Sequence, residues 1–505
     1  MVDNLKIKLG NQNEENFNDR YKLALPFFVE SIDINGEKQI KIVNEELILF
    51  WESLGYKKVV DEAGNYMLVH IQKGTIVKEI KDHFLRNEVR NYLKYLKKND
   101  VWGVFLKSDY VVKKLFESFE TIDMTRKTGD EKTGYLYYQN LILKVTEENV
   151  EFIEYEDFEG FIWEREIIKR DFVLNGNAEC VFGDFVWIIS NQEKERLKSI
   201  VSIIGYLIHS YKDPSFSKAV ILMDSEIEIE YDEANGGTGK SMIGKAVSHI
   251  VPILFVDGKT MKSNDKFRLS GLNNHHRIIV FDDVKCDFDF ESLYPMITGD
   301  LYIEKKYKNA VVIPSTETPK LLITSNYVVK GGGGNAEKRR KVEYEVSTYF
   351  KNILTPYEEF GHRLFDDWDE IEWVKFDNFM VKALQFYIKN GMIEPQSINI
   401  DYNRLKLETS TDFIDFMNTI IRNPQSYLKQ RLTNILIIDK NKFFESFLNT
   451  KPNTAKRITP IVFKKWIDKY CNYYNISTNH YKSNGSVFVE LNISNLSRNE
   501  SNTED

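Results

Sequence analysis

The chain has 505 residues, of which 42% are apolar, 13% aromatic and 29% charged. This composition excludes wholesale disorder, and the length corresponds to roughly three domains. Lys and Arg total 68 against 76 Asp and Glu, a formal net charge of -8. A uniformly basic surface is therefore excluded, and any nucleic-acid site must be a local basic patch.

The cysteines and the apolar segments indicate the surroundings in which the chain works. Cys180, Cys286 and Cys471 are far apart and form no CxxC or Cys/His cluster, which argues against a zinc ribbon or a disulfide framework. The N-terminus has no apolar signal core, and runs such as Ala219 to Met223 are too short to span a bilayer. We therefore expect a soluble cytoplasmic protein without a membrane partner.

The first part of the chain predicts an accessory α+β domain. Residues 1–40 are expected to be an N-terminal extension. Asn44 is expected to cap a helix that ends near Gly55, followed by a hairpin and a second helix up to Leu96. We assign the accessory domain to residues 41–135.

Residues 136–205 form a β-rich and strongly acidic segment. Residues 147–166 hold nine Asp or Glu and one Arg. Such a charge run is a poor surface for DNA. We interpret it as a solvated sheet face or as a subunit contact, that is, a collar or oligomerisation segment.

From about residue 206 the pattern changes to α/β, and we assign an ATPase domain to residues 206–395. Short apolar strands alternate with helical or loop segments, and strands that are apolar throughout indicate a sheet covered on both faces. The predicted strands are Ala219–Met223, Ile253–Val256, Ile278–Phe281 and Leu321–Ile323.

A glycine-rich loop precedes a predicted helix and is the strongest chemical signal in the sequence. Its glycines allow backbone N–H groups to approach phosphate oxygens, Lys240 can reach the β- and γ-phosphates of a nucleotide, and Ser241 can bind Mg²⁺. Ala234 replaces the first glycine of the usual pattern, and the alternative is a plain glycine-rich turn. The candidate nucleotide-binding residues are Asn235, Gly236, Gly237, Thr238, Gly239, Lys240, Ser241 and Met242.

The sequence RIIVFDDV predicts a strand that ends in two acids, Asp282 and Asp283. Asp282 follows Lys240 by 42 residues. Carboxylates at the carboxyl end of a strand lie beside such a loop in doubly wound sheets. Asp282 is expected to hold Mg²⁺ and Asp283 to polarise the attacking water, although Glu is commoner at the second position. The alternative is two surface acids after a core strand.

A third strand ends in Asn326, whose neutral amide can sense the γ-phosphate without adding charge. Arg339 and Arg340 follow in a KRRK run, and their guanidinium groups are candidates for fingers that reach the γ-phosphate of a neighbouring subunit. The alternative for this run is a solvated face. Lys240, Asp282, Asp283, Asn326, Arg339 and Arg340 thus make up the predicted catalytic set.

Between the acids and Asn326 the sequence predicts a basic hairpin. Lys305, Lys306, Tyr307 and Lys308 lie near its bend. Residues 301–341 contain nine Lys or Arg and three Asp or Glu, a net charge of +6. Lysines that track phosphates and a tyrosine that stacks on a base suit sequence-tolerant binding of single strands. An ordinary basic hairpin is the alternative.

Residues 396–493 predict helices followed by a helix and a hairpin, an order that suggests a winged-helix-like domain. Thr459-Pro460 starts the last helix, and Asn484-Gly485 marks the hairpin turn. Residues 451–490 carry a net charge of +5, from seven basic and two acidic residues. A DNA-facing surface would include Lys464, Lys465, Lys469 and Lys482, and a protein-contact role is the alternative. Residues 494–505 are expected to be a disordered tail.

The order of these motifs resembles the superfamily 3 helicases of viruses, phages and plasmids. The series GGTGKS, FDDV, ITGD, KK, ITSN and RR is most similar to the helicase part of phage and mobile-element primase-helicases, over roughly residues 140–395. The resemblance implies a P-loop, AAA+-like core that binds ATP and Mg²⁺. It also implies a hexameric ring around single-stranded or forked DNA, which moves usually 3′ to 5′ and inserts the hairpin at about residues 301–316 into the channel.

We therefore expect an ATP-dependent DNA helicase of a phage or mobile element in the bacterial host cytoplasm. Residues 1–200 show no DxD strand with a following catalytic His, so priming is left to a separate primase or polymerase as a further partner. One alternative is a nucleotide-switched DNA-binding initiator or scaffold without unwinding activity. A small-molecule kinase is disfavoured because it has no use for the basic hairpin.

Overall fold

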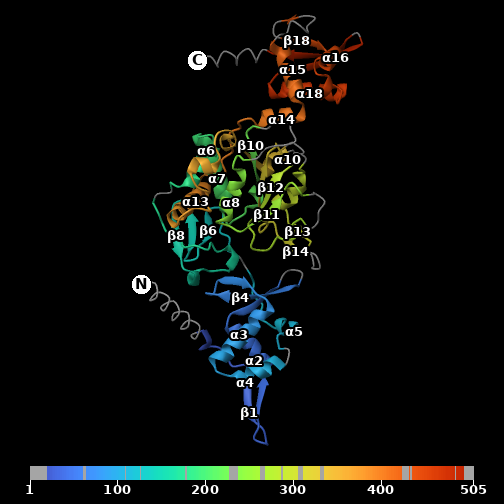
Figure 1. Cartoon of the computed structure of the whole chain (residues 1–505). Helices are drawn as coiled ribbons and strands as arrows, with labels where there is room; N and C mark the ends of the chain where they lie inside the picture. Colours follow the sequence, from blue (N-terminus) through green and yellow to red (C-terminus); the bar gives the residue numbers. More distant parts are fainter. Residues whose placement is uncertain are drawn as a thin grey trace.

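The computed structural model describes the chain from residue 20 to residue 493 with short gaps. The elements of the N-terminal part and those of the C-terminal part lie at opposite ends of a central body, which contains the largest sheet (Figure 1). The described ranges are 20–60, 64–107, 110–124, 127–176, 179–226, 237–261, 268–285, 288–304, 311–329, 335–422, 431–432, 435–483 and 485–493.

The N-terminal elements form a small α+β unit around its own core. They are β1 (Phe28–Ile32), β2 (Lys38–Ile42), α2 (Asn44–Ser53), β3 (Tyr56–Val60), β4 (Tyr66–Gln72), β5 (Ile76–Glu79), α3 (Asp82–Tyr95), α4 (Asn99–Lys107) and α5 (Lys113–Phe116). The helix, hairpin and helix agree with the prediction, but the predicted cap is wrong. Asn44 is the first residue of α2, and Val43 occupies the N-cap position without a side-chain hydrogen bond. Burial of Phe50 and Trp51 fixes this helix in place of a cap.

The acidic β-rich segment is attached to the central body rather than fully solvated. Its elements, with the helices that follow, are β6 (Thr133–Tyr137), β7 (Ile142–Thr146), β8 (Val150–Ile153), η1 (Tyr155–Asp157), β9 (Ile162–Trp163), η2 (Glu164–Glu166), α6 (Val181–Ile189), α7 (Lys194–Ile208) and η3 (Pro214–Phe216). Glu166 is buried and its carboxylate lies 2.9 Å from the Arg277 guanidinium of the central body. At this acid, the interpretation as a solvated face is wrong.

The central body is built on a five-stranded parallel sheet with the order β11-β12-β15-β10-β16. Its elements are β10 (Ala219–Asp224), α8 (Lys240–Ser248), β11 (Ile253–Asp257), β12 (Ile278–Val284), η4 (Glu291–Leu293), α9 (Tyr294–Thr298), β13 (Leu301–Ile303), β14 (Val311–Ile313), β15 (Lys320–Ser325), α10 (Asn335–Arg340), β16 (Lys341–Val346), α11 (Tyr349–Asn352), α12 (Pro356–Phe360) and α13 (Glu370–Asn390). The strand β16 was not expected from the sequence, because KVEYEV alternates apolar and charged residues and contains no apolar run.

Both faces of this sheet are covered, as the apolar strands predict. Val220 and Leu222 of β10 face a core formed with α6, α7, α8 and α13. Ile221 and Met223 face a second core, which includes the inward residues of the β13–β14 hairpin. The chain therefore has the mixed α/β architecture expected for this region.

The C-terminal elements pack around a core of their own. They are α14 (Ile400–Glu408), α15 (Thr411–Arg422), β17 (Arg431–Leu432), β18 (Ile435–Asp439), α16 (Lys440–Thr450), α17 (Pro452–Ala455), α18 (Pro460–Tyr473), β19 (Ser477–Ser483) and β20 (Ser486–Asn492). Thr459 caps α18 by accepting a hydrogen bond from the Val462 amide, as its sequence predicts. The predicted terminal hairpin is also present, with β19 antiparallel to β20 and Gly485 at a φ of +82° in the turn.

Within the described ranges, no helix has both the length and the apolar character that crossing a membrane requires.

Candidate functional site

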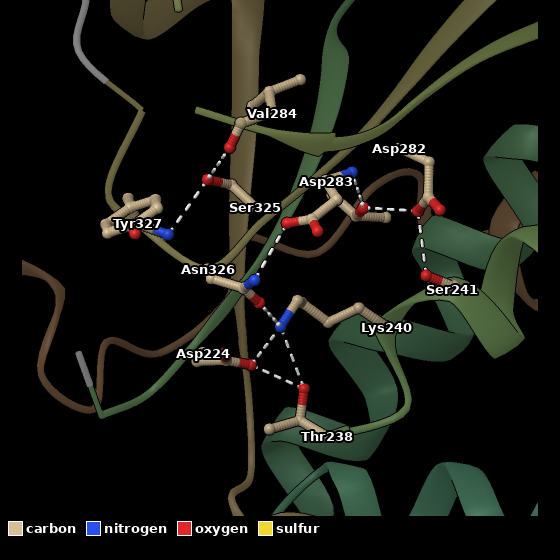
Figure 2. A network of polar contacts seen from close by, with 11 residues as sticks. Asp224, Thr238, Lys240, Ser241, Asp282, Asp283, Val284, Ser325, Asn326 and Tyr327 are labelled. Carbon is tan, nitrogen blue, oxygen red and sulfur yellow. Dashed lines mark hydrogen bonds and ion pairs between the residues drawn. The ribbon is translucent and has the colours of Figure 1, made fainter. Parts of the chain in front are cut away.

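The carboxyl ends of three neighbouring strands of the central sheet meet beside the start of α8. Asp224 ends β10, Asp282 and Asp283 lie at the end of β12, and Asn326 directly follows β15. Figure 2 shows these side chains converging on Lys240 and Ser241, the first two residues of α8. The prediction that the glycine-rich loop, the two acids and the amide lie together therefore agrees with the structure, whereas their chemical roles stay predictions.

The turn that leads into α8 requires glycine for two independent reasons. Gly239 is the N-cap of α8 and has a φ of +95°, in the left-handed region that side-chain-bearing residues rarely adopt. A Cβ atom added at Gly239 would also lie 2.8 Å from the ring of Phe185, which belongs to α6. Gly237 has a φ of +125°. This geometry leaves the first N–H groups of α8 available to an anion at the helix N-terminus.

Lys240 is buried and is held by three oxygen atoms of the site. Its ammonium forms an ion pair with Asp224 and donates hydrogen bonds to Asn326 Oδ1 at 2.9 Å and Thr238 Oγ1 at 3.1 Å. Thr238 in turn donates to Asp224 at 2.6 Å. Burial lowers the pKa of Lys240 from its ordinary value, and the nearby Asp224 carboxylate opposes that shift. The Lys240 side chain thus points into the site, and the Asp224 carboxylate neutralises its charge.

Ser241 and Asp282 form the oxygen-rich side of the site. The Ser241 hydroxyl donates to Asp282 Oδ1 at 2.9 Å, and the Thr324 hydroxyl donates to the same oxygen at 2.7 Å. Hydroxyl and carboxylate oxygens are the ligands that Mg²⁺ prefers. The donor set of this pair therefore fits the metal that the sequence predicts.

Asp283 points into the same site because the backbone turns at this residue. Neighbouring residues of a regular strand point to opposite faces, but Asp283 has a φ of +55° and the pairing of β12 with β15 shifts register between Phe281 and Val284. The Asp283 carboxylate accepts from Asn326 Nδ2 at 2.9 Å. It also lies 2.6 Å from the Lys259 ammonium, and this contact raises the pKa of Lys259.

Among the described residues, no group of three or more His, Cys, Asp or Glu side chains is arranged to hold a metal ion by itself. Mg²⁺ commonly uses one or two carboxylates and completes its ligands with substrate phosphates and water. The single Asp282 carboxylate next to a hydroxyl matches that pattern.

The remaining residues predicted for the loop have mixed outcomes. Met242 is half-buried, and its amide donates to the Gly239 carbonyl at 3.0 Å, so it shapes the turn. Asn235 and Gly236 lie outside the described residues, as does Ala234.

The two candidate arginine fingers differ in how they are held. Arg339 is exposed, and its Nε donates to the Asn335 carbonyl of its own short helix at 3.3 Å. Arg340 is half-buried and stacks on the Tyr294 ring, with its guanidinium carbon 4.9 Å from the ring centroid. Within the described part of the chain, neither guanidinium forms an ion pair. Arg339 is therefore the better placed of the two to reach another molecule.

The predicted basic patch at residues 301–341 is smaller than its net charge indicates. The antiparallel hairpin β13–β14 is present, but Lys305, Lys306, Tyr307 and Lys308 lie outside the described residues. Two of the nine basic residues are not at the surface. Lys320 binds the carbonyls of Tyr206 and His209, and Lys341 pairs with Glu337 and Glu343.

Three of the four C-terminal lysines are exposed. Lys464 and Lys465 lie on the outer face of α18, and Lys482 lies on β19. Lys469 instead forms an ion pair with Glu408 of α14 at 2.8 Å. This pair leaves Lys469 less available to a nucleic acid than the other three.

Asp224 and Lys259 are site residues that the sequence patterns missed. Asp224 is the last residue of the otherwise apolar β10, but it precedes Lys240 by 16 residues and so lies outside the glycine-rich loop motif. Lys259 follows β11 in the turn DGKT, where Gly258 packs against the β12 backbone and its amide donates to the Asp282 carbonyl at 2.7 Å. A charged residue at the carboxyl end of each predicted strand was the available signal for both.

Comparisons with known proteins show limited similarity. A family of unknown function, DUF5906, matches residues 233–340, which contain the site. No curated protein matches the chain. Two apo structures of the NrS-1 C-terminal region are similar at 13% and 14% identity, with TM-scores of 0.41 and 0.42. They cover 89% and 88% of this chain and 99% and 98% of their own chains, respectively.

A JCV helicase bound to a thiazolopyridine compound has 15% identity and a TM-score of 0.26, and the match covers 48% of this chain and 64% of that chain. All three TM-scores are below 0.5, so these likenesses do not indicate a function for this chain.

Proposed function

We propose that the chain is an ATP-dependent DNA helicase. Residues 206–395 would form a P-loop, AAA+-like ATPase core, and residues 396–493 a winged-helix-like DNA-binding domain. The observation that supports this best is the convergence of Lys240, the Ser241–Asp282 pair and the Asp283–Asn326 pair at one sheet edge. A lysine at a helix start, a metal-binding oxygen pair and a second acid are the parts that phosphoryl transfer to water needs.

Each residue has a defined role in this proposal. Lys240 and the N–H groups at the start of α8 would bind the β- and γ-phosphates of ATP. Ser241 and Asp282 would hold Mg²⁺, which when bound neutralises phosphate charge. Asp283 would accept a proton from the attacking water, and the Asn326 amide, which already joins Lys240 to Asp283, would report the presence of the γ-phosphate.

A DNA strand would be bound by the basic residues outside this site. Lys305, Lys306, Tyr307 and Lys308 at the hairpin bend, with Lys464, Lys465 and Lys482, would contact phosphates or bases of single-stranded or forked DNA. Such contacts predict binding that weakens strongly with salt.

Hydrolysis would take place in a hexameric ring. Arg339, which is exposed at the end of α10, would complete the nucleotide site of a neighbouring subunit.

A strand-displacement assay on forked DNA with ATP and Mg²⁺ tests the proposal. Lys240→Ala should abolish displacement and hydrolysis. Lys245→Ala is the matched control, because Lys245 lies on the same helix but pairs at the surface with Asp366 at 3.0 Å. Undiminished displacement by Lys240→Ala would reject the proposal.

Mixing two inactive variants tests the shared site. If Arg339 acts on a neighbour, Lys240→Ala and Arg339→Ala should each be inactive alone and recover part of the ATPase activity when mixed, because mixed rings contain some complete sites. Mass measurement with a non-hydrolysable ATP analogue and oligo-dT should then show a hexamer.

A second candidate is a nucleotide-switched DNA-binding initiator or scaffold without unwinding activity. The exposed lysines of α18 and β19 favour it, because they form a surface separate from the nucleotide site. Tight, sequence-specific duplex binding without strand displacement would identify this function.

A further inference from the structure

The carboxyl end of β10 is held by a side chain from outside the central sheet. Asn403 of α14 is 2% exposed, and its Nδ2 donates to the Ser225 carbonyl at 3.0 Å. The Ser225 amide donates in the other direction, to the Val346 carbonyl of β16 at 3.1 Å. Both backbone polar groups of Ser225, the first residue after β10, are therefore hydrogen-bonded.

The residue next to this anchor is the acid that neutralises Lys240. Asp224 binds both the Lys240 ammonium and the Thr238 hydroxyl, and it is 3% exposed. Because its carboxylate is one short side chain away from the backbone, its position depends on how the chain is held at Ser225. Any shift of that backbone would change the distance between Asp224 and Lys240.

The helix that supplies Asn403 belongs to two cores at once. Ile400 and Leu407 pack in the core of the central sheet, whereas Tyr402 and Leu405 pack in the C-terminal core. Figure 1 shows α14 between the central sheet and α18.

Polar contacts fix both ends of this helix. At its start, the buried Glu345 carboxylate of β16 accepts hydrogen bonds from the Ile398 and Asn399 amides, at 2.5 and 2.8 Å. At its end, Glu408 pairs with Lys469 of α18. The helix therefore makes a continuous mechanical connection between the C-terminal elements and β10.

We propose that Asn403 is a positioning residue of the nucleotide site, which acts by holding Asp224 against Lys240, and that α14 thereby couples the C-terminal elements to this site. The inference rests on the proposed nucleotide binding at Lys240. Phosphates must compete with Asp224 for the Lys240 ammonium, so the strength with which Asp224 is held sets the affinity for nucleotide.

A double-mutant cycle tests this positioning role. Asn403→Ala should tighten binding of a fluorescent, non-hydrolysable ATP analogue by about threefold, because Asp224 is less well placed to compete. In an Asp224→Asn background the same change should have no effect on affinity. Asp401→Ala is the control, because Asp401 is exposed on the same helix and, among the described residues, its side chain pairs only with neighbouring Arg404, at 3.3 Å.

The cycle separates positioning from a general structural role. Loss of a buried hydrogen bond should lower the melting temperature by the same amount in both backgrounds, since stability effects that do not act through Asp224 are additive. An equal change of affinity in both backgrounds, or no change in either, would overturn the inference and leave the proposed function intact. Failure of the unmodified protein to bind the analogue would instead overturn the proposed function.

A measurement in the absence of nucleotide tests the hydrogen bond between Asn403 and Ser225. Amide hydrogen exchange of residues 238–248 should be faster in Asn403→Ala than in the Asp401→Ala control. Unchanged exchange in this segment would contradict the inference whether or not nucleotide binds.

Oligo-dT completes the test of coupling. It should change the affinity for the analogue in the unmodified protein and in Asp401→Ala, and this change should be lost in Asn403→Ala. If oligo-dT has no effect on the unmodified protein, or an equal effect on all three, α14 does not transmit the signal.

Discussion

Two buried lysines at opposite ends of the central sheet have similar burial and very different surroundings. Lys240, at the carboxyl edge, is 6% exposed and pairs with the Asp224 carboxylate. Lys320, at the start of β15, is 4% exposed and donates to the carbonyls of Tyr206 and His209, at 2.6 and 2.7 Å. Those carbonyls lie at the C-terminus of α7, where backbone acceptors lack helical partners.

The difference indicates which lysine can change partners. Burial lowers the pKa of both, and at Lys320 the cations Lys212 and Arg277 lower it further, whereas at Lys240 a carboxylate opposes the shift. A carboxylate can be replaced by a phosphate of like charge, but carbonyls at a helix end cannot leave without unfolding the turn. We therefore expect Lys240 to serve ligand binding and Lys320 to serve stability.

The largest expected effect is the loss of hydrolysis in Lys240→Ala. Removing the group that stabilises transferring phosphate should lower kcat for ATP by about 10²–10³-fold. The steady-state ATPase assay measures this loss, and Lys320→Met provides the comparison. A similar loss per folded molecule in Lys320→Met would break the distinction between the two lysines.

The second effect is on stability. Lys320→Met removes the donor of two buried carbonyls, and leaving them unpaired should reduce the free energy of unfolding by about 1–3 kcal/mol. Urea denaturation measures this change. An unchanged midpoint would show that the contacts of Lys320 add nothing to stability.

The third effect is a dependence of stability on pH, which arises at His209 beside Lys320. Burial, together with the Lys320 charge, lowers the pKa of His209 to about 3, from an ordinary value of 6.5. Below pH 6.5 the unfolded chain binds a proton that the folded chain does not, so this group's stabilisation is complete above pH 6.5 and is lost as the pH falls toward 3.

The free energy of unfolding should fall less steeply with decreasing pH in His209→Gln, by about 1.4 kcal/mol per pH unit between pH 6 and 4. Denaturation curves at several pH values measure the slope. His70 and His249, whose pKa values are lowered to about 4, remain in both proteins and cancel in the difference. Identical slopes would mean that His209 titrates normally in the folded chain.

The smallest effect concerns the partner of Lys240. Asp224→Asn removes the charge that competes with phosphate, so nucleotide should bind about fivefold more tightly, while the nucleotide-free protein becomes less stable because a buried ammonium loses its counterion. Calorimetric titration and thermal melting measure the two changes. Weaker binding would show that Asp224 instead holds the loop in its binding conformation.

Local patterns predicted the parts of the site that lie close to a strong motif. The glycines, Lys240, Ser241 and the acids at the end of β12 were found because a glycine-rich loop before a helix and an apolar strand that ends in acids follow one another in a characteristic order. Asp224 was missed because it precedes Lys240 by 16 residues and so lies outside the glycine-rich loop motif, and Lys259 because a single lysine shortly after a strand has no distinctive pattern.

Tertiary contacts account for the other differences in the fold. The sequence of β16 contains no apolar run that would mark it as a strand of the covered sheet. It becomes the edge strand of this sheet because it pairs with β10 along its whole length. The net charge of residues 301–341 overstated the surface patch because two of its lysines are buried. Lys320 is buried against carbonyls far away in the sequence, and Lys341 against acids of its own segment. Asn403 could not be recognised at all, because its role depends on where α14 lies.

The left-handed backbone at Asp283 restricts which acidic residue can occupy this position. Asp and Asn tolerate this conformation better than longer side chains do, because their short polar groups find local hydrogen-bond partners. A glutamate here would have to adopt the same unfavourable main-chain angles with a bulkier side chain. The turn brings the carboxylate toward Asn326 and Lys259, and the shorter acid is the residue that such a turn accommodates.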